Sequence, residues 1–261
     1  MRAVCGVAVA ALTLAMPVGV LAQGDDLEAI EVILGYSLVD EVLSEQADAF
    51  LGVLEQIAGG GVASPEIEQV VREEFDPTRL RGYVVEELRE TSLPSELTEI
   101  ADLLRNGAIG QVSDLVVGYE PPESFQVFVI GLETSPPPEE RVELLAQLAD
   151  AQQASGFYLL QDETIREGAH RVLSVLTDGS SPPYAPLELS VEAEQLRRGR
   201  QFTIVSYLHR FRRVDDALVQ SATVEYRTEP GQRYVERYSL SLAEALQLAA
   251  LRVAGRLDRR P

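Results

Sequence analysis

Apolar residues recur at steps of three and four through the first half of the chain, and this spacing predicts amphipathic helices. The clearest stripe predicts a helix over residues 43–57 that ends at the glycines of residues 59–61. The stripe consists of Leu43, Ala47, Phe50, Leu51, Leu54 and Ile57. Two later helices should start at Ser64-Pro65 and Asp76-Pro77, where a capping side chain precedes a proline at the first helical position. We therefore expect helices that pack on one another through apolar faces.

The segment of residues 219–240 is compatible with two structures. Val224, Tyr226 and Thr228 alternate before Pro230-Gly231, which is the pattern of a β-hairpin with a type II turn. A helical stripe crosses the same segment and favours helices bent at Pro230-Gly231. This stripe consists of Tyr234, Tyr238, Leu242, Ala245, Ala249 and Val253. The prediction is an all-α fold, and the alternative is an α+β fold with a C-terminal β-hairpin near residues 219–240.

An internal repeat supports the helical prediction. A shift of 121 residues places Gly110-Gln111 over Gly231-Gln232. The same shift aligns Leu97 with Leu218, Ala101 with Ala222, Leu103 with Val224 and Arg89 with Arg210. We interpret the repeat as an internal duplication that gives two related helical-bundle units. The predicted units cover residues 23–120 and 121–261.

The segment before the last predicted helix carries a family resemblance. It reads Asp215-Asp216-Ala217-Leu218 and then continues from Ala222 to Gly231-Gln232. This resembles the bacterial secreted proteins of domain-of-unknown-function family 2059, in which a helix runs into a Phe-Tyr-Arg-Ser-Pro-x-Gly segment. Here Glu225 replaces the Phe, and the Pro stands directly before Gly231. The resemblance implies an all-helical periplasmic protein of uncharacterised activity, and it supplies no functional residue.

The first 22 residues have the features of a secretory signal peptide. Arg2 supplies the positive charge, residues 7–14 form an apolar core, and Val20-Leu21-Ala22 offers a cleavage site. Cleavage after Ala22 would also remove Cys5, the one cysteine, and would leave a mature chain without disulfides or thiolate metal sites. No later segment has the ~20 consecutive apolar residues of a membrane-spanning helix. We predict a periplasmic or secreted protein.

The composition is that of a globular protein, with 46% hydrophobic and 25% charged residues. The net charge of -20 makes this an acidic protein and argues against nucleic acid as a partner, because phosphate would be repelled. The charge is divided unevenly along the chain. Residues 1–194 carry 9 Arg and 35 acidic residues, a net charge of -26, and residues 195–261 carry 13 Arg and 7 acidic residues, a net charge of +6.

A run of arginines in the basic part is the candidate functional surface. It consists of Arg197, Arg198, Arg200, Arg210, Arg212 and Arg213, interleaved with Phe202, Tyr207 and Phe211. We expect Arg210, Arg212 and Arg213 to face carboxylates of the acidic part or of a second subunit, because the nearest counter-charge is the chain's own. The alternative is a surface that binds an anionic lipid or glycan.

Signatures of catalysis and of metal binding are missing from the sequence. Glu163, Glu167 and His170 share a helical face, but Glu-x-x-His is only half of the di-iron pattern, and His209 has Ser206 three residues before it. No Gly-x-Ser-x-Gly, His-Glu-x-x-His or Gly-rich phosphate loop occurs. We therefore predict no catalytic residues, no cofactor and no metal.

The sequence as a whole predicts a non-enzymatic helical protein that recognises a protein or peptide partner of the cell envelope through a groove between helices. The alternative function is an anionic lipid- or glycan-binding module that uses the arginine run. A membrane surface remains open as a partner, and the sequence does not predict the oligomeric state.

Overall fold

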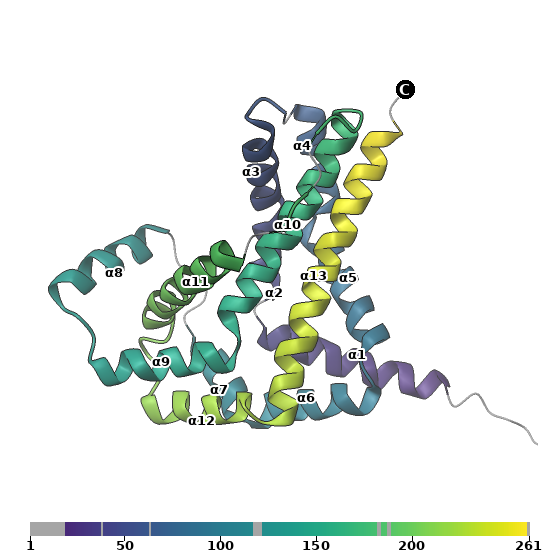
Figure 1. The fold of residues 1–261 in the computed structure, drawn as a ribbon. Coiled ribbons are helices and arrows are strands. Elements are labelled where there is room, and N and C mark those ends of the chain that lie inside the picture. The colour runs from purple at the N-terminus through teal and green to yellow at the C-terminus, as the bar shows by residue number, and fades with distance from the viewer. Residues whose placement is uncertain are drawn as a thin grey trace, which may run out of the picture.

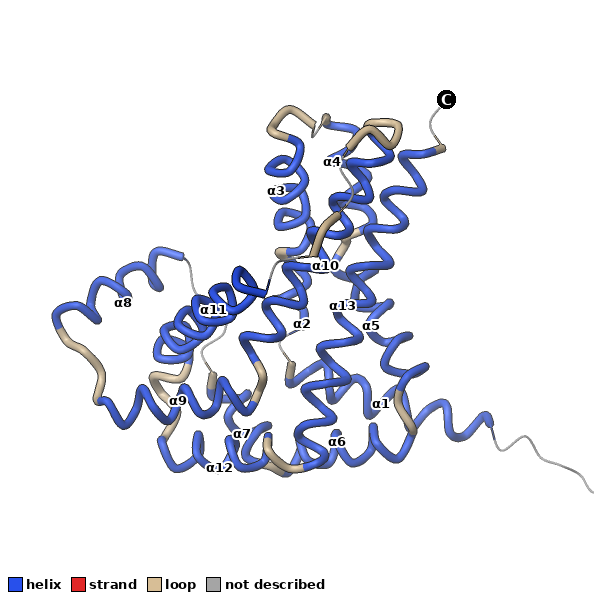
Figure 2. Tube along the Cα trace, viewed as in Figure 1, coloured by secondary structure: helices blue, strands red, loops and turns tan. Residues whose placement is uncertain are grey.

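The computed structural model describes residues 19–37, 39–62, 64–116, 122–181, 184–186 and 189–259. All regular secondary structure in these ranges is α-helical, so the all-α prediction is confirmed (Figure 2). None of the helices in these ranges is long and apolar enough to cross a membrane. Most of the predicted signal peptide lies outside the described residues, and the predicted cleavage site after Ala22 falls within the first helix.

Most of the helices follow one another after only a few residues. The first half contains α1 (Gly19–Tyr36), α2 (Val39–Ser44), α3 (Gln46–Ala58), α4 (Pro65–Glu74), α5 (Pro77–Thr91), α6 (Pro94–Asn106), α7 (Ala108–Leu115) and α8 (Pro122–Thr134). The second half contains α9 (Glu139–Ala151), α10 (Ala154–Leu176), α11 (Leu189–Arg210), α12 (Asp216–Tyr226) and α13 (Glu229–Asp258).

Two long helices, α10 and α13, run side by side through the molecule (Figure 1). Helix α13 also packs against α5, and α10 packs against α3. Helices α6, α7 and α12 lie together at one end of this pair, and α8 packs against α11 in an arm to one side (Figure 1). The long pair therefore connects helices that are far apart in the sequence.

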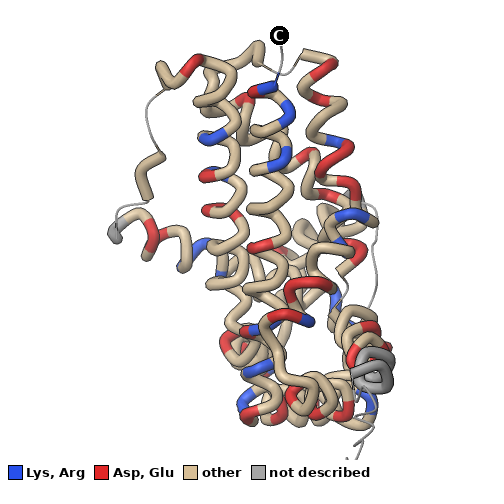
Figure 3. The backbone as a smooth tube through the Cα atoms, turned by 90° about the vertical axis from the view of Figure 1, so that its right-hand side faces the viewer, with Lys and Arg blue, Asp and Glu red and all other residues tan. Residues whose placement is uncertain are grey.

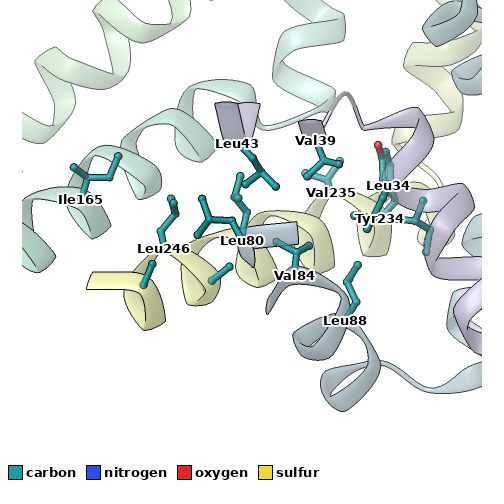
Figure 4. Packing of buried hydrophobic residues seen from close by; sticks show 14 of the residues in the cluster. Leu34, Val39, Leu43, Leu80, Val84, Leu88, Ile165, Tyr234, Val235 and Leu246 are labelled. Atoms are coloured by element: carbon teal, nitrogen blue, oxygen red, sulfur yellow. The ribbon is translucent and has the colours of Figure 1, made fainter. Parts of the chain in front are cut away.

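The two predicted units share one hydrophobic core. Figure 4 shows Leu80, Val84 and Leu88 of α5 lying beside residues of α13 such as Val235 and Leu246. Buried residues of α1, α2 and α10 belong to the same cluster. The predicted boundary near residue 120 falls among residues 117–121, outside the described residues.

Local signals in the sequence placed several helix ends correctly. The backbone N–H of Ile67 donates to the Ser64 hydroxyl at 3.3 Å, and that of Arg79 donates to the Asp76 carboxylate at 3.2 Å. Both helices have their proline in the first turn, as predicted. The helix predicted over residues 43–57 is divided, because α2 ends at Ser44 and α3 begins at Gln46. Helix α3 ends at Gly59, whose φ of 75° suits glycine.

The hairpin alternative for residues 219–240 is wrong, because this segment belongs to α12 and α13. The predicted bend is shifted, since the break lies at Arg227 and Thr228 instead of at Pro230-Gly231. The Thr228 hydroxyl accepts a hydrogen bond from the Gly231 N–H at 3.3 Å and so caps the new helix. Pro230 then occupies the first turn, where its missing donor costs nothing.

The two glycines aligned by the repeat occupy similar helix corners. Gly110 lies just after the break between α6 and α7, and Gly231 lies just after the break between α12 and α13. A Cβ atom on either glycine would overlap the carbonyl oxygen of the residue six positions earlier, Leu104 or Glu225. Helix α6 packs against α13, and α12 packs against α7. These similarities favour the internal duplication, which stays a prediction.

A buried carboxylate connects the end of α13 to the first half of the chain. Glu74 is 4% exposed, and its two oxygens accept hydrogen bonds from Arg79 at 2.5 Å and Arg256 at 2.8 Å. Burial alone would raise the pKa of Glu74, but the two guanidinium groups outweigh it and hold the pKa below its ordinary value. The carboxylate therefore stabilises the fold above its ordinary pKa of about 4.3, and this contribution is lost as the pH falls through the lowered pKa.

We expect Glu74→Gln to lower the free energy of unfolding by about 2 kcal/mol at neutral pH. This value is toward the low end of the range for hydrogen bonds between charged groups, because both arginines are partly hydrated. The matched control is Glu68→Gln on the same helix, which removes an exposed pair with Arg72 and should change stability little. Urea unfolding at several pH values measures both. A Glu74→Gln deficit that stays constant down to acid pH would contradict this assignment.

Candidate ligand-binding cavity

Within the part of the chain that the structure describes, six of the nine tyrosines line one cavity that is partly open to solvent. They are Tyr36, Tyr158, Tyr207, Tyr226, Tyr234 and Tyr238. We call it the tyrosine cavity. Its volume is about 190 Å³. An apolar cavity of about 150 Å³ is large enough to bind benzene, so this one can hold a ring or a branched aliphatic group.

Helices from both halves of the chain supply the walls of the tyrosine cavity. Tyr36 ends α1, Val112 comes from α7, and Tyr207 comes from α11. Tyr234 and Tyr238 lie one turn apart on α13, so both rings face the same side. The Tyr234 ring centroid lies 6.3 Å from the centroids of both Tyr226 and Tyr238. The cavity thus depends on the packing of the whole fold.

The buried hydroxyls of Tyr207, Tyr226, Tyr234 and Tyr238 are uncharged at physiological pH. Burial raises the pKa of Tyr226 to about 12, although a hydrogen bond with Gln152 opposes the shift. Burial also raises the pKa of Tyr207, Tyr234 and Tyr238 well above that of a free phenol. The Tyr207 hydroxyl donates to the side-chain oxygen of Gln152. The walls therefore combine apolar rings with neutral hydrogen-bonding groups.

A second pocket of about 460 Å³ adjoins the tyrosine cavity, and we call it the outer pocket. The two share the lining residues Glu41, Val42, Phe157, Tyr158 and Arg210. Among these shared residues, the Arg210 guanidinium lies 3.4 Å from the Glu41 carboxylate. This ion pair joins residues that are 169 positions apart and lies where the two spaces meet.

The structure separates the predicted arginine surface into several ion pairs. Arg197 and Arg198 both bond Glu194 on their own helix, and together they lower the pKa of Glu194 to about 2. Arg200 forms two hydrogen bonds of 2.9 Å with Asp150. Figure 3 shows the same pattern more widely, with basic and acidic positions close together on several helices. These arginines are therefore balanced by carboxylates of the same chain.

The three arginines expected to face the acidic part behave differently from one another. Arg210 does face a carboxylate of that part, because its partner Glu41 lies on α2. Arg212 and Arg213 are exposed, and Arg212 donates to the His209 carbonyl at 2.7 Å. Of the six arginines in the predicted surface, Arg210 is the one that lines the tyrosine cavity.

The histidines lie apart from each other. The His170 ring is 5.5 Å from the ring of Tyr184, and Glu167 pairs with Arg171 at 3.1 Å. His209 is buried between Phe125 and Phe128, with ring centroids 5.5 and 4.9 Å away. A search of the described residues finds no group of three or more side chains that could hold a metal ion.

The sequence did not reveal the tyrosine cavity. Tyr234 and Tyr238 belong to a predicted core stripe, and Tyr207 and Phe211 are aromatic residues interleaved with the predicted arginine surface. The one signal present was the concentration of tyrosine between residues 207 and 238. Tyr36 lies far away in the sequence, and its contribution depends on how α1 packs.

The fold and the cavity together define an all-α protein with an aromatic-lined space that can hold one ring or one branched aliphatic group. No family model, curated protein or solved structure matches the chain. The resemblance to domain-of-unknown-function family 2059 stays a prediction.

Proposed function

We propose that this protein is a non-enzymatic binding protein, periplasmic or secreted, that recognises a peptide or protein partner in the cell envelope. A large apolar or aromatic side chain of the partner enters the tyrosine cavity. The observation that carries the proposal is the gathering of six tyrosines around a space of about 190 Å³. Ligand sites are usually apolar concave spaces with a few polar groups, and this cavity has that composition.

Tyrosine walls suit the recognition of a peptide side chain. A phenol ring offers a large apolar face and loses little conformational freedom, and its hydroxyl can bond a neighbouring amide. Aromatic pairs contribute about 0.5–1.5 kcal/mol beyond the burial of their area. A phenylalanine in the cavity would meet several such rings, which supports an aromatic or large aliphatic anchor.

The chemistry of the lining supports binding over catalysis. A general acid or base works best with a pKa near the operating pH, and the raised pKa values of the buried tyrosines keep them far from it. Among the described residues that line the cavity, the charged ones are Glu41 and Arg210, which pair with each other. A hydrolytic or transfer reaction would need a nucleophile activated by a base. The lining serines, Ser37, Ser113 and Ser239, instead donate their hydroxyl hydrogens to backbone carbonyls.

The alternative function, binding of anionic lipid or glycan, has less support. It needs several unpaired arginines on one surface. Four of the six candidates, Arg197, Arg198, Arg200 and Arg210, have carboxylate partners in the same chain. We therefore favour recognition through the tyrosine cavity.

A single tryptophan tests the proposal, because the natural chain contains none. Tyr158 is 42% exposed and lines both spaces, so Tyr158→Trp places a fluorescent reporter beside them. We expect a blocked peptide Gly-Gly-Phe-Gly-Gly to change the reporter fluorescence saturably, with a Kd in the millimolar range or tighter. The same peptide with Ala in place of Phe should bind at least tenfold more weakly. Equal responses to both peptides would overturn the proposal.

A further inference from the structure

We infer that the outer pocket binds the peptide backbone next to the anchor side chain and selects a basic residue there. This inference rests on the proposed function. It specifies the partner as an extended peptide segment with a large apolar residue flanked by lysine or arginine.

Two buried glutamines provide the first argument. Gln46 of α3 and Gln161 of α10 line the outer pocket, and each residue is only 8% exposed. The Gln46 amide nitrogen donates to the Val42 carbonyl at 2.7 Å, which leaves its oxygen as a free acceptor. The Gln46 oxygen and the Gln161 nitrogen have no hydrogen-bond partner among the described residues.

Buried polar atoms without partners are rare in folded proteins, and each one calls for an explanation. Here one acceptor and one donor come from α3 and α10, which pack against each other. A peptide backbone carries one N–H donor and one C=O acceptor per residue and can satisfy both. The pair therefore matches an amide ligand better than a purely apolar one or a single ion.

The continuity of the two spaces provides the second argument. The outer pocket and the tyrosine cavity share Phe157, Tyr158 and Arg210 on one side and Glu41 and Val42 on the other. A side chain held in the tyrosine cavity would bring its own backbone to this shared boundary. The backbone would then continue past Gln46 and Gln161.

Charge provides the third argument. The acidic residues that line the outer pocket are Glu41, Glu45 and Asp162, and the basic side chains are those of Arg210 and His209. Arg210 pairs with Glu41 at 3.4 Å, and Asp162 pairs with Arg166 at 2.8 Å. Glu45 is exposed and forms no ion pair within the described ranges. The acidic excess, on a protein of net charge -20, favours a basic neighbour to the anchor.

The test uses isothermal titration calorimetry on the chain with its natural lining and three blocked peptides, Gly-Lys-Phe-Lys-Gly and its versions with both lysines replaced by Gln or by Glu. We expect the Lys peptide to bind about three- to tenfold more tightly than the Gln peptide, and the Glu peptide to bind most weakly. The difference should shrink as salt is raised, because the charges are near the surface. Glu45→Gln should reduce the preference for lysine. Glu68→Gln should not, because Glu68 is not a lining residue of the outer pocket and pairs with Arg72 of its own helix.

The glutamines are tested with Gln161→Met, which keeps the length of the side chain and removes its amide. We expect about tenfold weaker binding of all three peptides. Gln147→Met is the matched control, because Gln147 is exposed on α9 and bonds Glu143 of its own helix. Circular dichroism and thermal unfolding establish that each variant is folded.

The outcomes separate the inference from the proposed function. Loss of the Phe-over-Ala preference would overturn the proposed function and the inference together. The inference alone would be overturned by a different combination of results. In that case the preference for Phe over Ala is preserved, the Lys, Gln and Glu peptides bind equally, and Gln161→Met has no effect. If Gln161→Met does not fold, the Glu45→Gln comparison and the three peptides decide the question.

Discussion

Replacing Gly231 by alanine is expected to destabilise the protein by about 3 kcal/mol, the upper end of the usual cost of overpacking. A Cβ atom at this position would overlap the Glu225 carbonyl oxygen and lie 2.8 Å from the Tyr226 Cα atom. Both neighbours are backbone atoms at the corner between α12 and α13, so no side chain can rotate away. The corner itself must open, and it carries Tyr226 and Tyr234 of the tyrosine cavity.

Gly110→Ala should cause a loss of similar size, because its Cβ atom would overlap the Leu104 carbonyl oxygen at the corresponding corner. The matched control is Gly52→Ala within α3, where a Cβ atom would meet nothing within 4 Å. That change should stabilise the fold by about 0.5–1 kcal/mol through the higher helix propensity of alanine. Chemical denaturation measures all three variants.

Two results would contradict the account of the corners. If Gly231→Ala and Gly52→Ala changed the free energy of unfolding equally, the claim that backbone atoms crowd Gly231 at the corner would be wrong. If only one of Gly110→Ala and Gly231→Ala were destabilising, the equivalence of the two corners would fail, and with it the main structural support for the internal duplication.

Filling the tyrosine cavity is expected to have the largest effect on binding. Ser113 of α7 lines the cavity, and its hydroxyl donates to the Ile109 carbonyl of its own helix at 3.0 Å. Ser113→Leu would place a branched aliphatic group in the space that the anchor side chain needs. We expect peptide binding to fall at least tenfold and the stability of the free protein to stay equal or rise, because the added side chain is buried in an existing space.

The local features of this fold could be predicted from sequence because each depends on a few adjacent residues. Ser64 and Asp76 cap their helices as the Ser-Pro and Asp-Pro pairs indicate. The predicted bend at Pro230-Gly231 lies slightly beyond the observed break. Proline and glycine are strong bend signals, but Thr228 caps the new helix and so fixes its start. The hairpin alternative depended on strand propensity, which packing of a long apolar face can override.

The candidate site could not be predicted in the same way, because its parts come from distant segments. Tyr36 and Tyr234 share a cavity although 198 positions separate them in the sequence. The Arg210–Glu41 pair joins the basic and the acidic part of the chain, as the division of charge predicts. The sequence does not indicate which of the 42 acidic residues is the partner. Composition indicates that arginines of the basic part pair with carboxylates of the acidic part. The positions of these pairs depend on how the helices pack.

The most direct test of the central claim compares Ser113→Leu with Ser221→Leu by isothermal titration calorimetry, each as a single change that leaves the tyrosines in place. Ser221 is the matched control, because its hydroxyl bonds the Ala217 carbonyl of its own helix at 2.9 Å and it is exposed on α12. Both proteins are titrated with the blocked Gly-Lys-Phe-Lys-Gly peptide. The account predicts full binding by Ser221→Leu and at least tenfold weaker binding by Ser113→Leu, with both variants as stable as the parent. Equal binding by the two folded variants would contradict the claim that the tyrosine cavity receives the anchor side chain.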